Sequence, residues 1–231
     1  MVSMRILTSN STRQVLDVLV EKYTAASGND VSLSFDTAKS MVAKIRAGEQ
    51  GDVVILGRGA VDDLADAGIV APNSCRGFAR AVVGVAVRSG DPRPDISSVD
   101  AFRDALLASR SIAHTRYGAS GMYIPAMLDK LGIAEQMKAK TVNRDGGYIG
   151  EVVIAGEADI ALQQIPELLA VPGLDVVGPV PDEVQKTFAT AAAICNASTQ
   201  ATTARAMLGF FTDAVNAALF ADKGLQQVTK A

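Results

Sequence analysis

Short hydrophobic runs alternate along the chain with segments whose hydrophobic residues recur every three to four positions. The first pattern predicts buried β-strands and the second predicts amphipathic helices, so we expect an α/β protein with mostly parallel sheets. Strands are expected at residues 6–7, 31–35, 52–56, 79–87, 111–113, 159–162, 174–177 and 188–194. Helices are expected at residues 15–28, 40–48, 61–67, 101–108, 121–131, 149–155 and 200–230.

Two of the apolar runs, residues 79–87 and 188–194, stand where the chain would cross between two lobes. They divide the sequence into a first lobe of residues 1–80 and 187–231 and a second lobe of residues 81–186. We expect each lobe to hold a mixed sheet flanked by helices. Two crossing strands would form a hinge, and hinge closure around a ligand is the motion that such a connection favours.

The composition is that of an ordinary globular protein and excludes several classes of function. The 231 residues are 48% hydrophobic and 20% charged, and the net charge of −3 argues against nonspecific binding of nucleic acid. No apolar run reaches the roughly 18 residues of a membrane span. A Gly-rich P-loop, a dinucleotide fingerprint and a nucleophile elbow are also missing from the sequence. We therefore expect no cofactor, no nucleic acid partner and no membrane insertion.

The thiols and the imidazole offer no metal site. Cys75 and Cys195 are far apart in the sequence, and the chain has one histidine, so a zinc ligand set cannot be assembled. The two cysteines are either a disulfide or two free thiols, and free thiols are favoured.

The first residues, Met1-Val-Ser-Met4, carry no charged n-region, apolar h-region or cleavage site. This start predicts a cytoplasmic protein. The alternative is a periplasmic protein whose signal peptide has been removed.

Two strand-to-helix junctions are the most informative chemical feature. Residues 5–12 pass from a strand through hydroxyl side chains, including Ser11, into a helix, and residues 111–121 repeat the arrangement with Ser120. The N-terminus of a helix leaves backbone N–H groups without partners and carries roughly half a positive charge. The two junctions together predict a cleft between the lobes that holds an anion from both sides.

Several segments carry a resemblance to a known family over nearly the whole chain. They are Ile6-Leu-Thr-Ser-Asn-Ser11, Leu33-Ser-Phe35, Gly51-Asp-Val-Val-Ile55, Asp63-Leu-Ala-Asp-Ala-Gly-Ile-Val70, Phe78-Ala-Arg80, Gly156-Glu-Ala-Asp159 and the expected C-terminal helix. The chain resembles the periplasmic molybdate-binding proteins of ABC transporters. This resemblance implies the two-lobed type II solute-binding-protein fold.

In that family, hydroxyl and backbone N–H groups bind the oxyanion without a charged partner. The resemblance assigns Ser11 to the first ligand serine and assigns backbone donors to Ser120 and Gly146. Ala38 stands where a second ligand serine is usual, although Thr37 beside it offers a hydroxyl.

A second departure from the family is Gln164, which stands where the family usually has a ligand tyrosine. Basic residues also appear at positions expected to line the cleft, and these are Arg13, Lys39, Arg58 and Arg116. Guanidinium groups suit carboxylates, because they bind them through two hydrogen bonds. An oxyanion site built from neutral dipoles does not need fixed cations, so the departures favour an organic di- or tricarboxylate over molybdate.

Aconitate isomerase resembles the same family, and it shifts a double bond in a tricarboxylate without a cofactor. Such chemistry needs cations to hold carboxylates and a base to move a proton next to one of them. His114 is the candidate base, because an imidazole titrates near neutral pH. The alternative for His114 is a hydrogen-bonded core histidine, just as Ser11 is either a ligand or a helix cap and Asp36 either a base or a turn residue.

The sequence therefore favours an enzyme that binds a small polycarboxylate in the interlobe cleft and isomerises it. The first rival is a non-catalytic substrate-binding protein that delivers molybdate, tungstate, another oxyanion or a carboxylate to an ABC permease. The second rival is a cytoplasmic ligand sensor.

Overall fold

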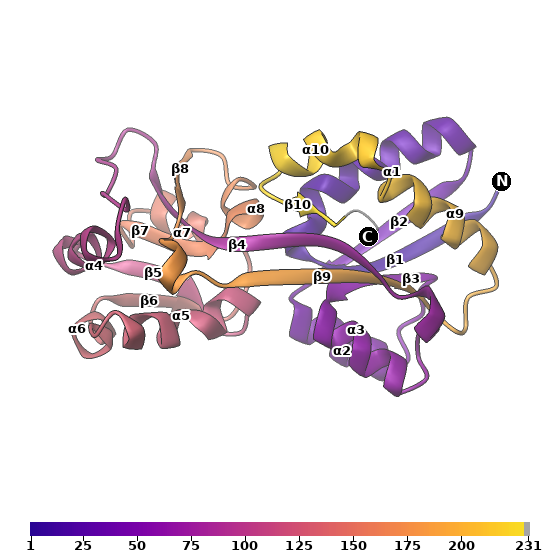
Figure 1. Ribbon diagram of the computed structural model, residues 1–231, viewed down its shortest axis with the longest axis horizontal. Helices are drawn as coiled ribbons and strands as arrows, with labels where there is room; N and C mark the ends of the chain where they lie inside the picture. Colours follow the sequence, from indigo (N-terminus) through magenta and orange to yellow (C-terminus); the bar gives the residue numbers. More distant parts are fainter. Residues whose placement is uncertain (229–231) are drawn as a thin grey trace. The chain divides into compact units, whose positions relative to one another are not determined.

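The computed structural model describes residues 1–228. The chain forms two compact units, which are Met1–Arg80 with Ala189–Ala231 (unit 1) and Ala81–Phe188 (unit 2). The strands β4 (Arg76–Arg88) and β9 (Thr187–Ile194) run from one unit into the other (Figure 1). The second boundary falls within β9, after residue 188 rather than after residue 186 as expected from the sequence.

Unit 1 has a central sheet in the order β2-β1-β3-β9, with β1, β2 and β3 parallel and β9 antiparallel to β3. Ala79 and Arg80 of β4 pair with β10. The other elements are β1 (Ser3–Ser9), η1 (Asn10–Thr12), α1 (Arg13–Ser27), β2 (Asp30–Asp36), α2 (Ala38–Arg46), β3 (Val53–Gly57), α3 (Arg58–Asp66), η2 (Pro72–Ser74), α9 (Ala201–Phe211), η4 (Ala214–Asn216), α10 (Ala217–Asp222) and β10 (Gln226–Gln227).

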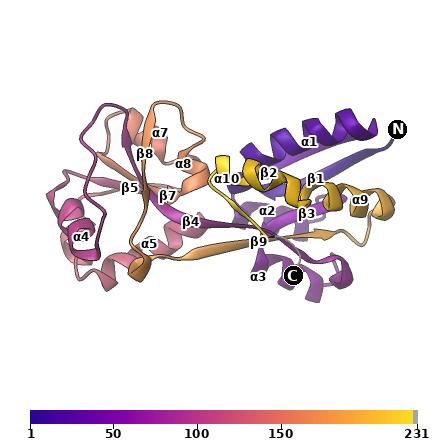
Figure 2. The ribbon, with the colours of Figure 1, turned by 45° about the horizontal axis from the view of Figure 1, so that its top comes forward.

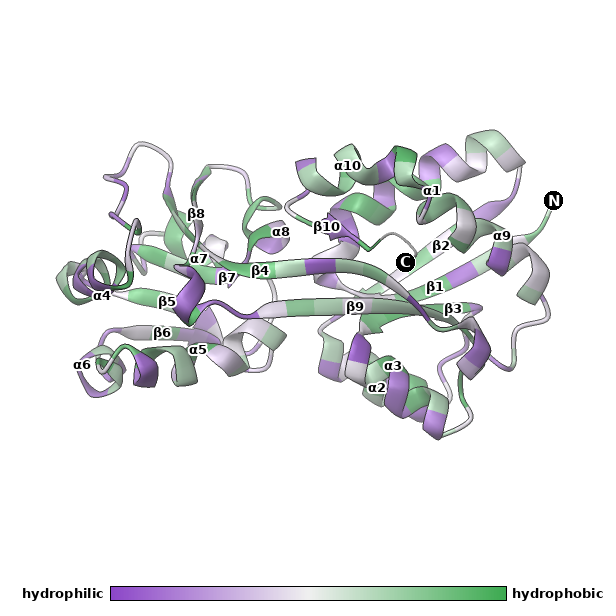
Figure 3. Ribbon diagram, in the orientation of Figure 1, coloured by the Kyte–Doolittle hydropathy of each residue, from purple (hydrophilic) through white to green (hydrophobic). Residues whose placement is uncertain are grey.

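Helices cover both faces of this sheet, and α1 and α3 lie on opposite sides of the strands (Figures 1 and 2). On one face α2 and α3 pack Met41, Ile45 and Leu64 against Leu7 of β1 and Leu56 of β3. On the other face α1 packs against α9. The first four residues of β3, Val-Val-Ile-Leu, are all buried, as expected of a strand covered on both faces. Figure 3 shows β3, β4 and β9 as mostly hydrophobic, whereas α2 and α3 mix hydrophobic and hydrophilic residues.

Unit 2 has a sheet in the order β6-β5-β7-β4-β8, in which β5, β6 and β7 are parallel and β4 is antiparallel to both β7 and β8. Its other elements are α4 (Val99–Ala108), β5 (Ile112–Thr115), α5 (Ala119–Lys130), α6 (Ala134–Lys138), β6 (Thr141–Arg144), α7 (Gly150–Ile154), β7 (Ile160–Gln164), α8 (Ile165–Leu168), β8 (Leu174–Pro179) and η3 (Asp182–Val184).

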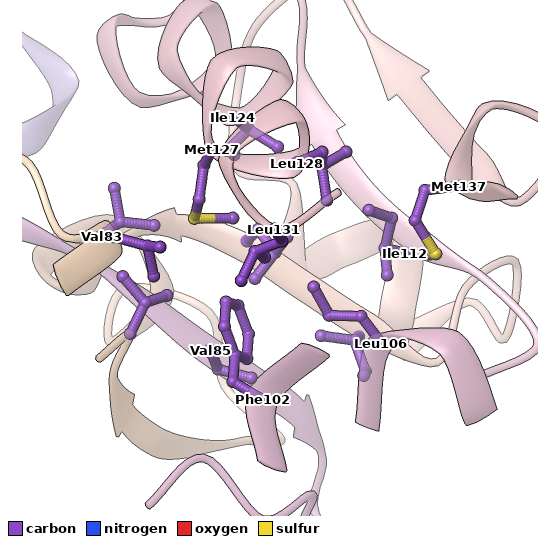
Figure 4. Packing of buried hydrophobic residues seen from close by; sticks show 14 of the residues in the cluster. Val83, Val85, Phe102, Leu106, Ile112, Ile124, Met127, Leu128, Leu131 and Met137 are labelled. Atoms are coloured by element: carbon purple, nitrogen blue, oxygen red, sulfur yellow. The ribbon is translucent and has the colours of Figure 1, made fainter. Parts of the chain in front are cut away.

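The larger core of unit 2 lies between its sheet and helices α4, α5 and α6. Phe102 and Leu106 of α4 and Met127 of α5 pack there against Val85 and Ile112 of the strands (Figure 4). A smaller core on the other face joins Ile149 and α7 to Ala113 and Ala161. The two faces follow from the alternation of side chains along each strand.

The expected helix over residues 200–230 is wrong as one element. The helix α9 ends at Phe211, and η4, α10 and β10 follow it; residues 229–230 of the expected helix lie outside the described residues. Asp213 caps η4 by accepting a hydrogen bond from Val215 N at 2.9 Å, and Gly224 takes a left-handed conformation (φ +70°) beyond α10. These are local stop signals that helical propensity alone overlooks.

Six short elements match no expected strand or helix, namely η1, η2, α6, β6, α8 and η3. The strand β6 reads Thr-Val-Asn-Arg and is only partly buried at the edge of its sheet, so it has no hydrophobic run to reveal it. The helix α8 is only four residues long.

Both cysteines are free thiols in the structure, and burial raises the pKa of Cys195 to about 12. Within the described residues no helix has the length and apolar character needed to cross a membrane.

Candidate functional site

The connections of unit 1 diverge at the carboxyl ends of two neighbouring strands. After β1 the chain leads through α1 to β2 on one side, and after β3 it leads through α3 toward β4 on the other side. In open α/β sheets such a divergence leaves a crevice outside the strand ends, where ligands bind. Ser11 follows β1 and Arg58 follows β3, so the structure brings these two predicted residues to the same edge.

Unit 2 has the same arrangement at β5 and β7. After β5 the chain leads through α5 and α6 to β6, and after β7 it leads through α8 to β8, which pairs with β4. The segment that follows β5 carries Arg116 and Ser120, the one that follows β6 carries Gly146, and Gln164 ends β7. The predicted residues of this unit therefore collect at the carboxyl edge of its sheet.

Three buried hydroxyl side chains lie in the junction between β1 and α1. Ser9 and Ser11 are buried with their Oγ atoms 3.3 Å apart, and Thr12 donates to the carbonyl oxygen of Ser9 at 3.0 Å. The N-cap of α1 is Thr12 rather than Ser11, and its side chain makes no cap hydrogen bond. Ser11 is therefore not the cap of α1. No side chain caps the first N–H groups of this helix.

The helices at the carboxyl edge of unit 1 begin with basic residues. Arg13 and Arg58 are the first residues of α1 and α3, Lys39 is the second residue of α2, and none of these described helices has an acidic residue in its first turn. A cation at the positive end of a helix dipole is electrostatically unfavourable, and a bound anion would offset the cost. The exposed Arg58 is held by Asp62, whose carboxylate oxygens lie 2.8 and 2.9 Å from its Nε, and Arg13 stacks 3.8 Å from the ring centre of Phe35.

The side chains of Thr37 and Asp36 both stabilise helix α2. The hydroxyl of Thr37 accepts a hydrogen bond from Ser40 N at 3.2 Å, so it caps the helix that begins at Ala38. Asp36 Oδ2 pairs with Lys44 at 2.7 Å, and this hydrogen bond lowers the pKa of the carboxyl group. Asp36 is thereby a poor proton acceptor and matches the turn residue of the two alternatives.

In unit 2 the start of α5 is shaped around Thr115. Gly118 is the N-cap, so it provides no side-chain cap, and Ser120 in the first turn is buried. The Oγ1 atom of Thr115 is buried without a hydrogen-bond partner among the described residues. A methyl group on Gly118 would lie 2.5 Å from that oxygen, and one on Gly121 would overlap the backbone carbonyl of Thr115. Both glycines thus allow the helix to start close to this unsatisfied hydroxyl group.

Gly146 lies in a loop that a buried glutamine holds in place. Gln163 accepts a hydrogen bond from Ile149 N and donates one to the carbonyl oxygen of Gly147, both at 2.9 Å. Arg116 reaches the same loop through an exposed pair with Asp145 at 3.2 Å. A surface pair of this kind is worth little, so Arg116 can exchange Asp145 for a ligand carboxylate at small cost.

At the end of β7, the buried Gln164 donates through Nε2 to Glu167 Oε2 at 3.3 Å. Burial raises the pKa of the Glu167 carboxyl group to about 8, although hydrogen bonds from the side chain and backbone of Gln164 lower it in part. A carboxyl group that titrates near neutral pH can both take up and release a proton.

His114 lies in the interior of unit 2 with both ring nitrogens engaged. Nδ1 is 2.9 Å from the carbonyl oxygen of Thr115, and Asn143 Nδ2 is 3.2 Å from Nε2. The imidazole therefore donates through Nδ1 and accepts through Nε2, which is the neutral tautomer. Burial lowers the pKa of His114 below its ordinary value of 6.5, and the hydrogen bond to Thr115 offsets this effect only in part. This environment is the one expected of a core histidine.

Sequence reasoning missed Ser9, Thr115 and Glu167. The two hydroxyl residues had a visible signal, since each stands at the end of a strand in a segment already singled out. Glu167 had a weaker one, an acidic residue three positions beyond a buried strand.

Comparison with known proteins places the chain in a family. A family model described as bacterial extracellular solute-binding protein matches residues 4–226. The chain belongs to this family, which does not support the cytoplasmic location expected from the sequence. It is also 34% identical over 194 residues to aconitate isomerase from Pseudomonas sp., a match that covers 84% of this chain and 74% of that protein.

Two solved structures show the same fold. The periplasmic molybdate-binding protein of Azotobacter vinelandii aligns with a TM-score of 0.83 at 16% identity, over 99% of this chain and 100% of that one. The sulfate-binding protein SubI from Mycobacterium tuberculosis H37Rv aligns with a TM-score of 0.77 at 17% identity, over 99% of this chain and 88% of that one. The resemblance to the molybdate-binding proteins and the expected α/β fold class are confirmed.

Proposed function

We propose that this protein binds a small polycarboxylate and isomerises it by shifting a double bond, without a cofactor. The observation that carries the proposal is the 34% identity to aconitate isomerase over 84% of the chain. That identity is twice the 16% shared with the molybdate-binding protein, which has the same fold. Aconitate, a tricarboxylate, is accordingly the first substrate to test.

The basic helix starts support a carboxylate ligand. Arg58 and Arg116 are both exposed, and among the described residues they pair with the partly exposed Asp62 and the exposed Asp145, which a ligand carboxylate can replace. Guanidinium groups form paired, charge-assisted hydrogen bonds to carboxylates, which are stronger than bonds between neutral groups. We assign Ser11, Lys39, Arg58, Arg116 and Ser120 to holding the carboxylates.

The remaining predicted positions have lesser roles in this proposal. Four of them contact the ligand without balancing its negative charge, since none has an ionised side chain: Thr37, Ala38, Gly146 and Gln164. His114 is the base predicted from the sequence, and acting as one requires Nε2 to give up its bond with Asn143. Loss of turnover in His114→Ala together with unchanged ligand binding would support that role.

The alternative is a receptor that binds an oxyanion or a carboxylate and delivers it to an ABC permease. The match to the extracellular solute-binding family favours this alternative. In either case the family favours a location outside the cytoplasm, and we propose the periplasm.

Thermal unfolding with a panel of anions tests the ligand class. The panel contains molybdate, tungstate, sulfate, phosphate, cis- and trans-aconitate and citrate. A ligand at about 100 times its dissociation constant adds about 2.7 kcal/mol, which corresponds to roughly 5–10 °C in melting temperature for a chain of this size.

Each result points to one function. A shift with carboxylates alone supports the proposal, and NMR in heavy water then reports whether hydrogen at a substrate carbon exchanges. A shift with molybdate or tungstate alone overturns the carboxylate proposal. Carboxylate binding without exchange or isomerisation establishes a receptor.

A further inference from the structure

Glu167 is a carboxyl group that the ligand-holding residues do not use. It follows β7 directly, in the first turn of α8, and its side chain is only partly exposed. None of the ion pairs among the described residues involves Glu167, and its side-chain partner is the neutral amide of Gln164. An ionised carboxylate here has lost water without gaining a cation, so its protonated form is favoured.

The strand register brings Glu167 to the edge where unit 2 presents its anion-binding groups. Ile112 and Ala113 of β5 pair with Ile160 and Ala161 of β7. Beyond this paired register, β5 runs to its end at Thr115, and β7 runs to its end at Gln164, three residues before Glu167. The carboxyl group therefore follows the strand next to the one that leads into α5, where the connections diverge and a ligand is expected.

We propose that Glu167, rather than the buried His114, is the catalytic group that removes a proton from, and returns a proton to, a tricarboxylate bound at the carboxyl edge of unit 2. The proposal rests on the isomerase function proposed above. Its support is the position at the divergence of β5 and β7, the neutral partner Gln164 and the partial exposure of the residue.

The step is balanced without any other reactant. The Glu167 carboxylate takes a proton from the methylene carbon next to a substrate carboxylate, so a C–H bond breaks and an O–H bond forms. The electron pair spreads over the neighbouring double bond and carboxylate, whose charge the N–H groups of α5 and Arg116 stabilise. Glu167 then delivers a proton, either the one it removed or one exchanged with solvent, to the far carbon of the former double bond, which leaves the double bond shifted and Glu167 ionised.

The strands that pack against α8 carry no unpaired titratable group that would mask the titration of Glu167. Helix α8 packs against β7 and β8. Glu167 is the only titratable residue of α8 and β7, and Asp175 of β8 is paired with Arg93 at 3.5 Å. Burial raises the pKa of Glu167 to about 8, so the rate of exchange should rise with pH and level off above that value.

The test compares the full chain with Glu167→Gln and with the control Glu135→Gln. Glu135 is an exposed residue in the first turn of α6, so the control removes the same charge from a comparable helix position. The amide keeps the shape of the protonated acid, and Glu167→Asp serves as a second variant that retains a carboxyl group. Trans-aconitate is the probe, its binding is followed by thermal shift, and its hydrogen exchange and isomerisation are followed by NMR in heavy water.

We expect Glu167→Gln to bind trans-aconitate within about threefold of the unmodified chain and to exchange it at least about 100-fold more slowly, the size typical of a lost general base. Glu135→Gln should retain both properties, and Glu167→Asp should exchange slowly but with a pH-dependent rate. Equal exchange in Glu167→Gln and the unmodified chain would overturn the role of Glu167 alone. An unmodified chain that binds trans-aconitate without exchanging it would overturn the isomerase function, and this role with it.

Discussion

Asn143 lies directly opposite His114 on the neighbouring parallel strand, with its amide nitrogen 3.2 Å from Nε2 of the imidazole. Because Nδ1 is also engaged, by the carbonyl oxygen of Thr115, the buried ring is held in its neutral form. This relationship connects the folding stability of unit 2 to the protonation of a single side chain.

Acid should therefore destabilise the fold partly through His114. Burial lowers the pKa of the folded form below its ordinary 6.5, so between those two values the unfolded chain binds more protons. The free energy of unfolding should then fall as the pH falls below 6.5, by at most about 1.4 kcal/mol per pH unit for one proton. Urea unfolding of the unmodified chain and of His114→Asn at about pH 5 and 7.5 measures the difference.

Both proteins contain the same carboxyl groups, so their contributions cancel in the comparison. His114 is the single histidine of the chain, so no other imidazole contributes to the difference. A pH dependence of the same slope in His114→Asn would contradict the neutral, buried imidazole.

Gly121→Ala should disrupt the start of α5. The added methyl group would overlap the carbonyl oxygen of Thr115, which is backbone and cannot rotate away. Forcing a methyl group into a packed site costs about 1–3 kcal/mol, and we expect a loss of that size in urea unfolding.

Gly209→Ala is the matched control, since Gly209 lies inside α9 and a methyl group there would meet no atom within 4 Å. Alanine is favoured over glycine within helices by roughly 0.5–1 kcal/mol, so this variant should be as stable as the unmodified chain or more so. Equal effects of the two substitutions would show that the start of α5 is not tightly packed.

Thr115→Val should separate ligand binding from stability. The buried hydroxyl has no partner among the described residues, so replacing it with a methyl group should leave the fold equally stable or stabilise it by up to about 1 kcal/mol. If the hydroxyl donates to the ligand, affinity for the best anion of the panel should fall about tenfold, which is about 1.4 kcal/mol.

Thr141→Val on the neighbouring strand is the opposite case. Its hydroxyl donates to the carbonyl oxygen of Met137 at 2.8 Å, so its loss should cost about 1 kcal/mol of stability and leave affinity unchanged. Unchanged affinity in Thr115→Val would remove this hydroxyl from the ligand site.

The two arginines that flank β5 provide a test of the charge requirement. Arg116 follows the carboxyl end of the strand, whereas Arg110 precedes its amino end and pairs with Asp159 at 2.7 Å. Charge-assisted bonds contribute about 1.5–3 kcal/mol, so Arg116→Gln should weaken tricarboxylate binding by roughly 10-fold to 100-fold, measured by calorimetry. Arg110→Gln removes the same charge at the other edge of the sheet and should bind normally. Equal losses in both variants would indicate long-range attraction rather than contact.

The sequence predicted most strands and helices, because their hydrophobic periodicity is a local property. It failed where that signal is weak or interrupted. The edge strand β6 has no apolar run, and the C-terminal segment turns at Asp213 and Gly224 despite its helical propensity. Both failures concern segments whose structure depends on pairing or on a single turn residue rather than on a repeated pattern.

The candidate site divides in the same way. The sequence showed which polar residues follow strand ends, since strand-to-helix junctions are local. These residues are Ser11, Arg58, Arg116 and Ser120. That Arg58 begins its helix could not be read, because the expected helix started three residues later, at Val61.

By itself, the sequence determined the order of most strands and helices and the polar residues at the junctions that follow β1 and β5, because neighbouring residues set these patterns. The tertiary structure decided which strand ends are neighbours, with β1 beside β3 and β5 beside β7. It also decided that His114 is held neutral by Asn143 and that Glu167 is desolvated without a cation. Burial and partnership are properties of segments brought together from distant parts of the chain, so no local pattern could have revealed them.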